Sequence, residues 1–317
     1  MRMRDLFEKN PGLKYIFFGG KGGVGKTVMA GATAIYLARS GRRTLLASTN
    51  PVHSLSSLFG QDLFGEERAV EGVQNLWAYE IDTSETVERA KKEIKDKINW
   101  FLKFSDIPVQ SDEFVDLATL NPAFEESAMF ENMVDIMLAD RYEVYVFDTA
   151  PTANARRLLG MSKVYTLWVE KMLRSRKEAI SLRKALSFRK GEEERDPLLE
   201  YLLSFRERIE KARGILTDPS KTTFIFVTLP EALPIAVIKR FISWFRDFGI
   251  PIGGVVVNGI IRESGGDEFV ENRIAMQRER LEEVYRDLNP VLGEIPLYEK
   301  EVRGIEMLSV VAEDLFR

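Results

Sequence analysis

One nine-residue stretch, GGKGGVGKT at residues 19–27, constrains the fold more than any other part of the chain. It fits the pattern G-x-x-x-x-G-K-[ST] through Gly20, Gly25, Lys26 and Thr27. A short apolar run at 14–19 precedes it, and small and apolar residues at helical spacing follow it through 26–40. Between a buried strand and a helix, such a loop cradles phosphate oxygens with its backbone N–H groups. The sequence therefore predicts a phosphate-binding loop.

The chemistry of the loop residues predicts their roles. The Lys26 ammonium is expected to reach the β- and γ-phosphates of a nucleotide, and the Thr27 hydroxyl is expected to bind Mg²⁺. The expected nucleotide-binding residues of the loop are Gly20, Lys21, Gly22, Gly23, Val24, Gly25, Lys26, Thr27 and Val28. The alternative is a glycine-rich turn without a ligand, but this pattern arises by accident in only about one per cent of chains of this length.

Apolar runs of strand length recur along the chain, with helical segments between them. Further strands are expected at 43–48, 76–82, 143–149, 222–228, 252–258 and 292–295. Helices are expected between them, notably at 231–248 and 267–288. Strands that alternate with helices pair in parallel through right-handed crossovers. The sequence thus predicts an α/β fold, a doubly wound and mostly parallel sheet of the P-loop NTPase type.

Two stretches lack a convincing strand and indicate helices instead. Residues 84–140 and 155–216 are therefore expected to form an inserted α-helical subdomain. The phosphate-binding domain then comprises residues 1–83, 141–154 and 217–317. Apolar residues at 161–188 and in LLEYLLSF (198–205) are consistent with an ordinary helical core, or with an apolar groove lined by adaptable methionine and phenylalanine side chains.

Composition narrows the class of protein. The chain of 317 residues has no cysteine, which excludes disulfides, cysteine zinc sites and thiolate metalloid sites. Its net charge of −4 gives no reason to expect nucleic acid as a partner. The N-terminal residues are too charged for a signal peptide, and no apolar run reaches the ~18 residues that cross a bilayer. We expect a soluble, cytoplasmic protein that does not insert stably into a membrane.

An early lysine gives the phosphate loop a more specific resemblance. GGKGGVGKT resembles the deviant phosphate loop of the MinD/ParA/ArsA class of ATPases. In that class the early lysine reaches the nucleotide of the partner subunit. The resemblance therefore implies that Lys21 acts in trans, within a nucleotide-bridged homodimer, and that Lys21 and Lys26 both serve catalysis.

Segments far from the loop extend the resemblance. DTAPT at 148–152 follows an apolar strand and resembles a motif whose carboxylate, here Asp148, holds a water of Mg²⁺. The other matching segments are LPE at 229–231 with Arg240 downstream, Asn258 at the end of GGVVVN, and PLYEKEVRG at 296–304. Together these motifs resemble the Get3/ArsA family of ATPases across nearly the whole chain.

The family resemblance implies further site residues. Asn258 is expected to hydrogen-bond adenine, although an asparagine at a strand end is also a common turn former. Pro296 and Leu297 are expected in the loop that closes over the base. The implied cofactors are ATP or ADP and Mg²⁺, with Thr27 and Asp148 at the metal. A single phosphate loop and the absence of cysteine favour the homodimeric Get3 type, which carries tail-anchored membrane proteins, over a tandem arsenite pump. Any such dimer forms without the zinc held by Cys-x-x-Cys in many members.

Both switch segments depart from the family pattern. The first switch has Asn50 in STNPVHSL where the family has an aspartate that activates the attacking water. An amide can orient water but cannot accept its proton, so hydrolysis is expected to be slow. The second switch has Ala153, Asn154 and Ala155 in place of Gly-His-Thr. His53 is expected to be a structural or switch residue, with a role as general base as the alternative.

Two other functions stay open at the level of sequence. A hydrolysis-impaired, ATP-dependent switch or scaffold would act on a protein partner and would explain the altered switch segments. A MinD/ParA-type positioning ATPase would bind membrane or DNA. The C-terminal GIEMLSVVAEDLFR is amphipathic but lacks the basic face that anionic lipids favour, which weighs against the second alternative.

Overall fold

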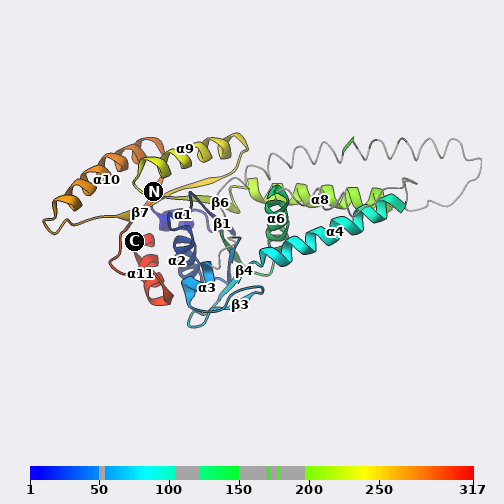
Figure 1. The fold of residues 1–317 in the computed structure, drawn as a ribbon, viewed down its shortest axis with the longest axis horizontal. Helices are drawn as coiled ribbons and strands as arrows, with labels where there is room; N and C mark the ends of the chain where they lie inside the picture. The colour runs from blue at the N-terminus through cyan, green and yellow to red at the C-terminus, as the bar shows by residue number, and fades with distance from the viewer. Residues whose placement is uncertain (50–53, 104–121, 150–169, 172–173, 175–177, 179–196) are drawn as a thin grey trace, which may run out of the picture.

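The computed structural model describes residues 1–49, 54–103, 122–149, 170–171, 174, 178 and 197–317 (Figure 1). Within these residues an eight-stranded sheet has the order β3-β4-β2-β5-β1-β6-β7-β8. Its strands are β1 (Tyr15–Gly19), β2 (Thr44–Ser48), β3 (Arg68–Ala69), β4 (Leu76–Glu80), β5 (Val144–Asp148), β6 (Thr222–Thr228), β7 (Ile252–Ile260) and β8 (Val291–Pro296). All neighbouring strands pair in parallel except β3 and β4, which are antiparallel.

Helices cover both faces of the sheet, so the fold is doubly wound. Their bounds are α1 (Met3–Lys9), α2 (Lys26–Arg39), α3 (Ser54–Phe59), α4 (Thr83–Lys103), α6 (Pro122–Leu138), α8 (Pro197–Thr217), α9 (Ala232–Asp247), α10 (Glu268–Asp287) and α11 (Gly304–Phe316). Helices α1, α2, α3 and α11 pack on one face, and α9 and α10 lie on the other (Figure 1). This arrangement confirms the predicted α/β class.

Successive side chains of the central strands point to opposite faces of the sheet and so contribute to two separate hydrophobic cores. In β1, Ile16 and Phe18 enter the core beneath α2, whereas Tyr15 and Phe17 enter the opposite core. The Phe17 ring stacks on Phe147 with centroids 4.8 Å apart, so large rings fill the space between neighbouring strands. Strands buried on both faces appear in sequence as continuous apolar runs, which is why their positions could be predicted.

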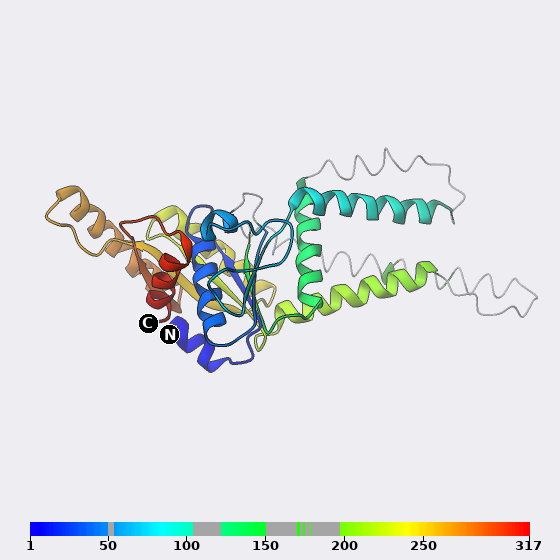
Figure 2. The same ribbon diagram turned by 90° about the horizontal axis from the view of Figure 1, so that it is seen from below.

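Three helices extend beyond one end of the sheet (Figures 1 and 2). In this group α6 is joined to α4 by a hydrogen bond from Asn132 Nδ2 to Thr86 Oγ1 of 3.1 Å. It is joined to α8 by an ion pair of 2.6 Å between Arg208 and Asp135. The helical character predicted for 84–140 and 155–216 is therefore found in α4, α6 and α8, where these stretches are described. The division into domains stays a prediction, and most of the apolar stretch at 161–188 lies outside the described residues.

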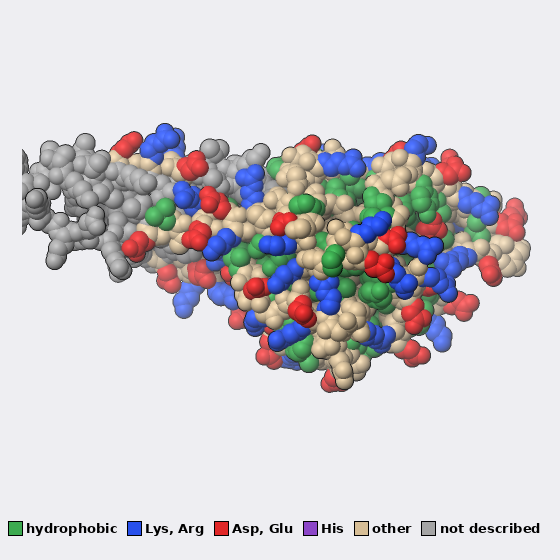
Figure 3. Space-filling model, turned by 180° about the vertical axis from the view of Figure 1, so that it is seen from behind, with side chains coloured by type: hydrophobic (Ala, Val, Ile, Leu, Met, Phe, Trp, Pro, Cys, Tyr) green, Lys and Arg blue, Asp and Glu red, His purple; other side chains and the backbone are tan. Residues whose placement is uncertain are grey.

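The charge of the surface and the length and polarity of the helices bear on possible contacts with membranes or nucleic acid. Basic and acidic side chains are interspersed over the face that Figure 3 presents, so charge of one sign does not dominate that face. In the described part of the chain, every helix is too short or too polar to span a bilayer.

Three elements of the structure were not predicted from the sequence. The antiparallel β3 has only two residues, too few for a periodic pattern. The short helices α1 and α3 have seven and six residues, which is less than the length at which helical spacing is recognisable. Strand β7 also continues to Ile260, two residues beyond the predicted end at 258.

Candidate functional site

The phosphate loop connects the end of β1 to the start of α2, as predicted. Gly20 has φ +148°, and a Cβ atom placed there would lie 2.4 Å from the backbone oxygen of Val227 on β6. Gly25 precedes the first residue of α2 with φ +94°, in the left-handed region. Side chains at either position would strain the backbone or collide with it. These two glycines therefore allow the loop to turn tightly against the sheet.

Lys26 projects over the loop from the first turn of α2. Its Nζ donates a hydrogen bond of 3.2 Å to the Lys21 carbonyl oxygen, so the ammonium lies across the loop. Burial lowers the pKa of Lys26, and the nearby Asp148 carboxylate opposes this effect. A partly desolvated ammonium that spans the loop is well placed to pair with a phosphate anion.

Asp148 is the buried centre of the site, with only 1% of its surface exposed. Its Oδ2 accepts a hydrogen bond of 2.7 Å from Thr27 Oγ1 and another of 3.2 Å from Ser48 Oγ. Burial raises the pKa of Asp148, whereas Thr27, Lys26 and Ser48 act in the opposite direction. The predicted metal residues Thr27 and Asp148 are thus in direct contact. Hydroxyl and carboxylate oxygens are ligands that suit Mg²⁺ or its bound waters, so the donor set fits the ion.

Strand register explains why these side chains meet. Residues Ser48 on β2 and Phe18 on β1 both pair with Asp148 on β5, so all three lie in one row near the carboxyl ends of the strands. The loop begins immediately after β1 at that edge. Ligands of open parallel sheets bind at this edge, where loops from several strands converge.

The residues expected around the base lie at the same edge of the sheet. Asn258 on β7 donates from Nδ2 to the Val24 carbonyl oxygen at 3.0 Å, so it contacts the phosphate loop. Pro296 pairs with Ile260 of β7 at the end of β8. Leu297 follows it, with its amide bonded to the Ile260 carbonyl at 2.9 Å and 64% of its surface exposed. The adenine contacts of all three residues stay predictions.

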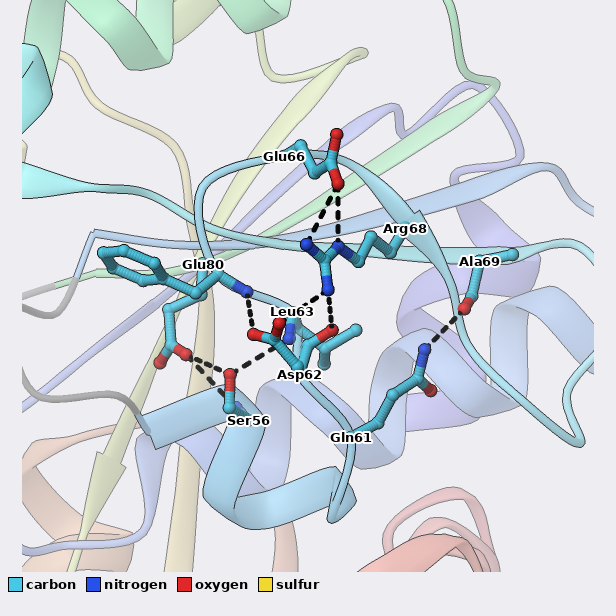
Figure 4. A network of polar contacts seen from close by, with 9 residues as sticks. Ser56, Gln61, Asp62, Leu63, Glu66, Arg68, Ala69 and Glu80 are labelled. Carbon is cyan, nitrogen blue, oxygen red and sulfur yellow. Dashed lines mark hydrogen bonds and ion pairs between the residues drawn. The ribbon is translucent and has the colours of Figure 1, made fainter.

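A carboxylate that the sequence did not reveal lies beside this row. Glu80 ends β4, pairs with Ser48 and is 1% exposed. Its carboxylate accepts from the Leu55 amide at 2.9 Å, the Ser56 amide at 3.3 Å and the Ser56 hydroxyl at 2.5 Å. Glu80 thereby anchors the first turn of α3 to the sheet (Figure 4). The available signal was a lone acidic residue at the end of the apolar run LWAYE.

Some predicted site residues lie outside the part of the chain that the structure describes. Asn50 and His53 of the first switch, and Ala153, Asn154 and Ala155 of the second, lie outside the described residues. Lys21 is described and is exposed to solvent. Its predicted contact with a partner subunit stays a prediction.

Comparison with known proteins gives one consistent result. The model of the family described as "Anion-transporting ATPase" matches residues 13–317. The "ATPase ASNA1 homolog 2" of Paramecium tetraurelia is 31% identical over 99% of this chain and 97% of its own length. The "ATPase get3" of Aspergillus terreus is 34% identical, covering 96% and 90% of the two chains. For "ATPase GET3A" of Arabidopsis thaliana the identity is 31%, with coverage of 94% and 82%.

Proposed function

The chain belongs to the anion-transporting ATPase family, as its motifs predicted, and we propose that it is a slow, homodimeric ATPase that chaperones tail-anchored membrane proteins. Family membership and relatives named as ATPases establish the ATPase activity. The dimer, the slow rate, the cytoplasmic location and the client are the proposed parts.

The contact between Thr27 and Asp148 beneath the phosphate loop is the observation that carries the nucleotide chemistry. Thr27 and Asp148 would hold Mg²⁺ and one of its waters, and the bound ion supplies neutralising charge to the phosphates. Lys26 and the N–H groups at the start of α2 would stabilise charge on the γ-phosphate oxygens. These residues bind and orient ATP, which is most of what phosphoryl transfer requires of a protein.

The proposed dimer rests on Lys21. It is exposed at the start of the loop, while Lys26 spans the loop from the same chain. Two lysines in one phosphate loop thus have different surroundings. We assign Lys26 to the nucleotide of its own subunit and Lys21 to that of the partner, as in the class that the loop resembles.

The slow turnover rests on Asn50. A carboxylate in this place would take the proton of the attacking water, whereas an amide can only orient that water. Positioning and charge stabilisation remain, so hydrolysis continues at a reduced rate. The altered second switch would also weaken the coupling between ATP hydrolysis and opening of the dimer.

The proposed client follows from the Get3 resemblance and from the helices. Relatives named GET3 match 94% and 96% of this chain, and α4, α6 and α8 form a helical group beyond the sheet (Figure 2). Such a group can contribute an apolar surface for a transmembrane segment when two subunits meet. ATP-driven closure of the dimer would then change the affinity for the client.

Co-purification with a tail-anchored client tests this proposal. The wild-type chain is expected to retain the client in a complex whose yield changes when Mg-ATP is added. Lys26→Ala is the matched control, because it should abolish the response to ATP while leaving the helical group intact. A wild-type protein that neither retains the client nor responds to ATP would contradict the assignment.

A hydrolysis-impaired switch or scaffold is the second candidate, favoured by Asn50 and the altered second switch. It predicts ATP-dependent binding of a protein partner with almost no turnover. Measuring kcat for the wild-type chain and for Asn50→Asp tests it, because brisk turnover with Asn50 would remove the reason for this alternative. A membrane-positioning role finds less support, because Leu308, Val311 and Phe316 on the apolar face of α11 are buried in the core.

A further inference from the structure

Asn258 bridges a strand of the sheet and the phosphate loop, although 234 residues separate it from Val24 in the chain. The partner of the side chain is the Val24 carbonyl oxygen, 3.0 Å from Nδ2. A carbonyl oxygen only accepts hydrogen bonds, so the amide must turn its NH₂ group toward the loop. The second hydrogen and the carbonyl oxygen of Asn258 keep their capacity to bond another group.

This bond fixes the direction of a peptide group inside the loop. In a planar trans peptide, the C=O of one residue and the N–H of the next point in opposite directions. Because Asn258 holds the Val24 carbonyl, the Gly25 N–H is held pointing the other way. Asn258 therefore sets the orientation of one of the backbone donors on which a phosphate-binding loop depends.

The packing around this bond leaves little freedom. A Cβ atom at Gly25 would lie 2.4 Å from Asn258 Nδ2, so the glycine is fitted closely to the amide. The Val24 side chain is 1% exposed and packs in the core on the α2 side of the sheet. Asn258 follows Val257 on β7, and Val257 pairs with Thr228 of β6 and Glu294 of β8. A strand of the sheet thus holds the middle of the loop.

We propose that Asn258 is a positioning residue for phosphate binding, which acts through the Val24–Gly25 peptide and independently of the base. This inference rests on the proposed nucleotide site and deepens it. It assigns to Asn258 a task that would persist for a ligand that has phosphates and no adenine. Recognition of the base alone would give Asn258 no influence on such a ligand.

Inorganic tripolyphosphate with Mg²⁺ is the probe, since it presents the phosphate chain without a base. Wild type and Asn258→Ala are titrated calorimetrically with tripolyphosphate and with ATP. The comparison separates a role of Asn258 in phosphate binding from a role in recognition of the base. We expect the variant to bind tripolyphosphate about tenfold more weakly, the size of one lost hydrogen bond within a polar site. ATP binding should weaken by at least the same factor.

Asn258→Leu serves as a second variant, because it keeps the approximate size of the side chain and removes the donor without adding a charge beside the phosphates. Thermal unfolding verifies that each variant is folded, and the exposed Asn272→Ala on α10 is the control for an asparagine removed elsewhere. If the variants weaken ATP and leave tripolyphosphate unchanged, Asn258 recognises the base only and the inference is wrong. If wild type binds neither ligand, the proposed nucleotide site itself fails.

Discussion

At the scale of one residue, Asp148 is a carboxylate whose ionised form is disfavoured by burial in the site. The carboxylate is almost completely buried, and burial raises its pKa above the ordinary value of 3.8 despite hydrogen bonds from Thr27 and Ser48. The folded state therefore favours the protonated form relative to the unfolded chain. The charged form costs folding free energy, and a bound cation offsets that cost. The residue is thus suited to binding rather than to stability.

Asp148→Asn is expected to stabilise the metal-free protein and to abolish hydrolysis. Well below pH 3.8 the carboxyl is neutral in both the folded and the unfolded state, so wild type and variant should differ little there. As the pH rises through the raised folded pKa, wild type loses stability that the variant keeps, about 1.4 kcal/mol for each unit of the pKa shift. Urea unfolding over a pH series measures the difference. A stability difference that shrinks as pH rises would contradict this account.

The sequence was most informative where a local motif requires a particular residue type at a particular position. The structure brings Gly20, Lys26, Thr27 and Asp148 to one edge of the sheet, as the loop pattern and the strand end indicated, and their roles in binding stay predictions. The bond from Asn258 to Val24 was not predicted, because no local pattern shows which strand end meets which loop atom. Glu80 was missed for the same reason, since its partners on α3 lie about 25 residues earlier in the chain.

At the scale of elements, α3 depends on an acceptor from another strand. Its six residues are too few for a stable isolated helix. Glu80 satisfies two of the amide donors at its N-terminus, and Ser56 in turn accepts from the Leu63 amide at 3.1 Å (Figure 4). The helix is therefore held by hydrogen bonds to β4 as well as by its apolar contacts, such as those of Leu55.

Glu80→Ala is expected to lower the free energy of unfolding by about 3 kcal/mol, because it leaves buried donors of α3 without an acceptor. Glu80→Gln keeps one acceptor oxygen and should lose about 1 kcal/mol. Glu66→Ala is the matched control in the same network, where the pair with Arg68 is exposed and screened by solvent, so its loss should change stability much less. Urea denaturation ranks the three variants. Equal losses for Glu80→Ala and Glu66→Ala would show that Glu80 is not a structural anchor.

Predictability also varied among the elements. The central strands β1, β5 and β6 were predicted because every residue in them is buried and the runs are apolar. Helices α9 and α10 were predicted from apolar spacing. The antiparallel β3 depends on pairing with Trp77 and Ala78 of β4. Tertiary contacts decide such a short element, and two residues carry no signal of their own.

At the scale of the whole molecule, two subunits are expected to close around ATP. The phosphate loop and the helical group belong to one chain, so a change at the nucleotide can reach a client only through movement of these parts. Substitutions of Lys21 and of Lys26 should therefore affect different properties. Lys21 would connect the two subunits, whereas Lys26 would bind the nucleotide within its own subunit.

Lys21→Ala is expected to bind ATP close to the wild-type affinity and to lose both ATP-dependent dimerisation and most turnover. Lys26→Ala is expected to lose ATP affinity by tenfold or more, because a charged partner of the phosphates is removed. Light scattering with and without Mg-ATP, together with nucleotide titration, separates the two. A dimer of Lys21→Ala that forms normally with ATP would contradict the action of Lys21 in trans.

The rate of ATP hydrolysis tests the central claim most directly. Steady-state kcat and KM are measured side by side for the wild-type chain and for Asn50→Asp. We predict a low wild-type kcat, and an increase of about tenfold to a hundredfold in Asn50→Asp, which is within the range for a restored general base. The KM for ATP should change little, because the phosphate loop is untouched. Brisk turnover by the wild-type protein, or an unchanged kcat in Asn50→Asp, would contradict the account.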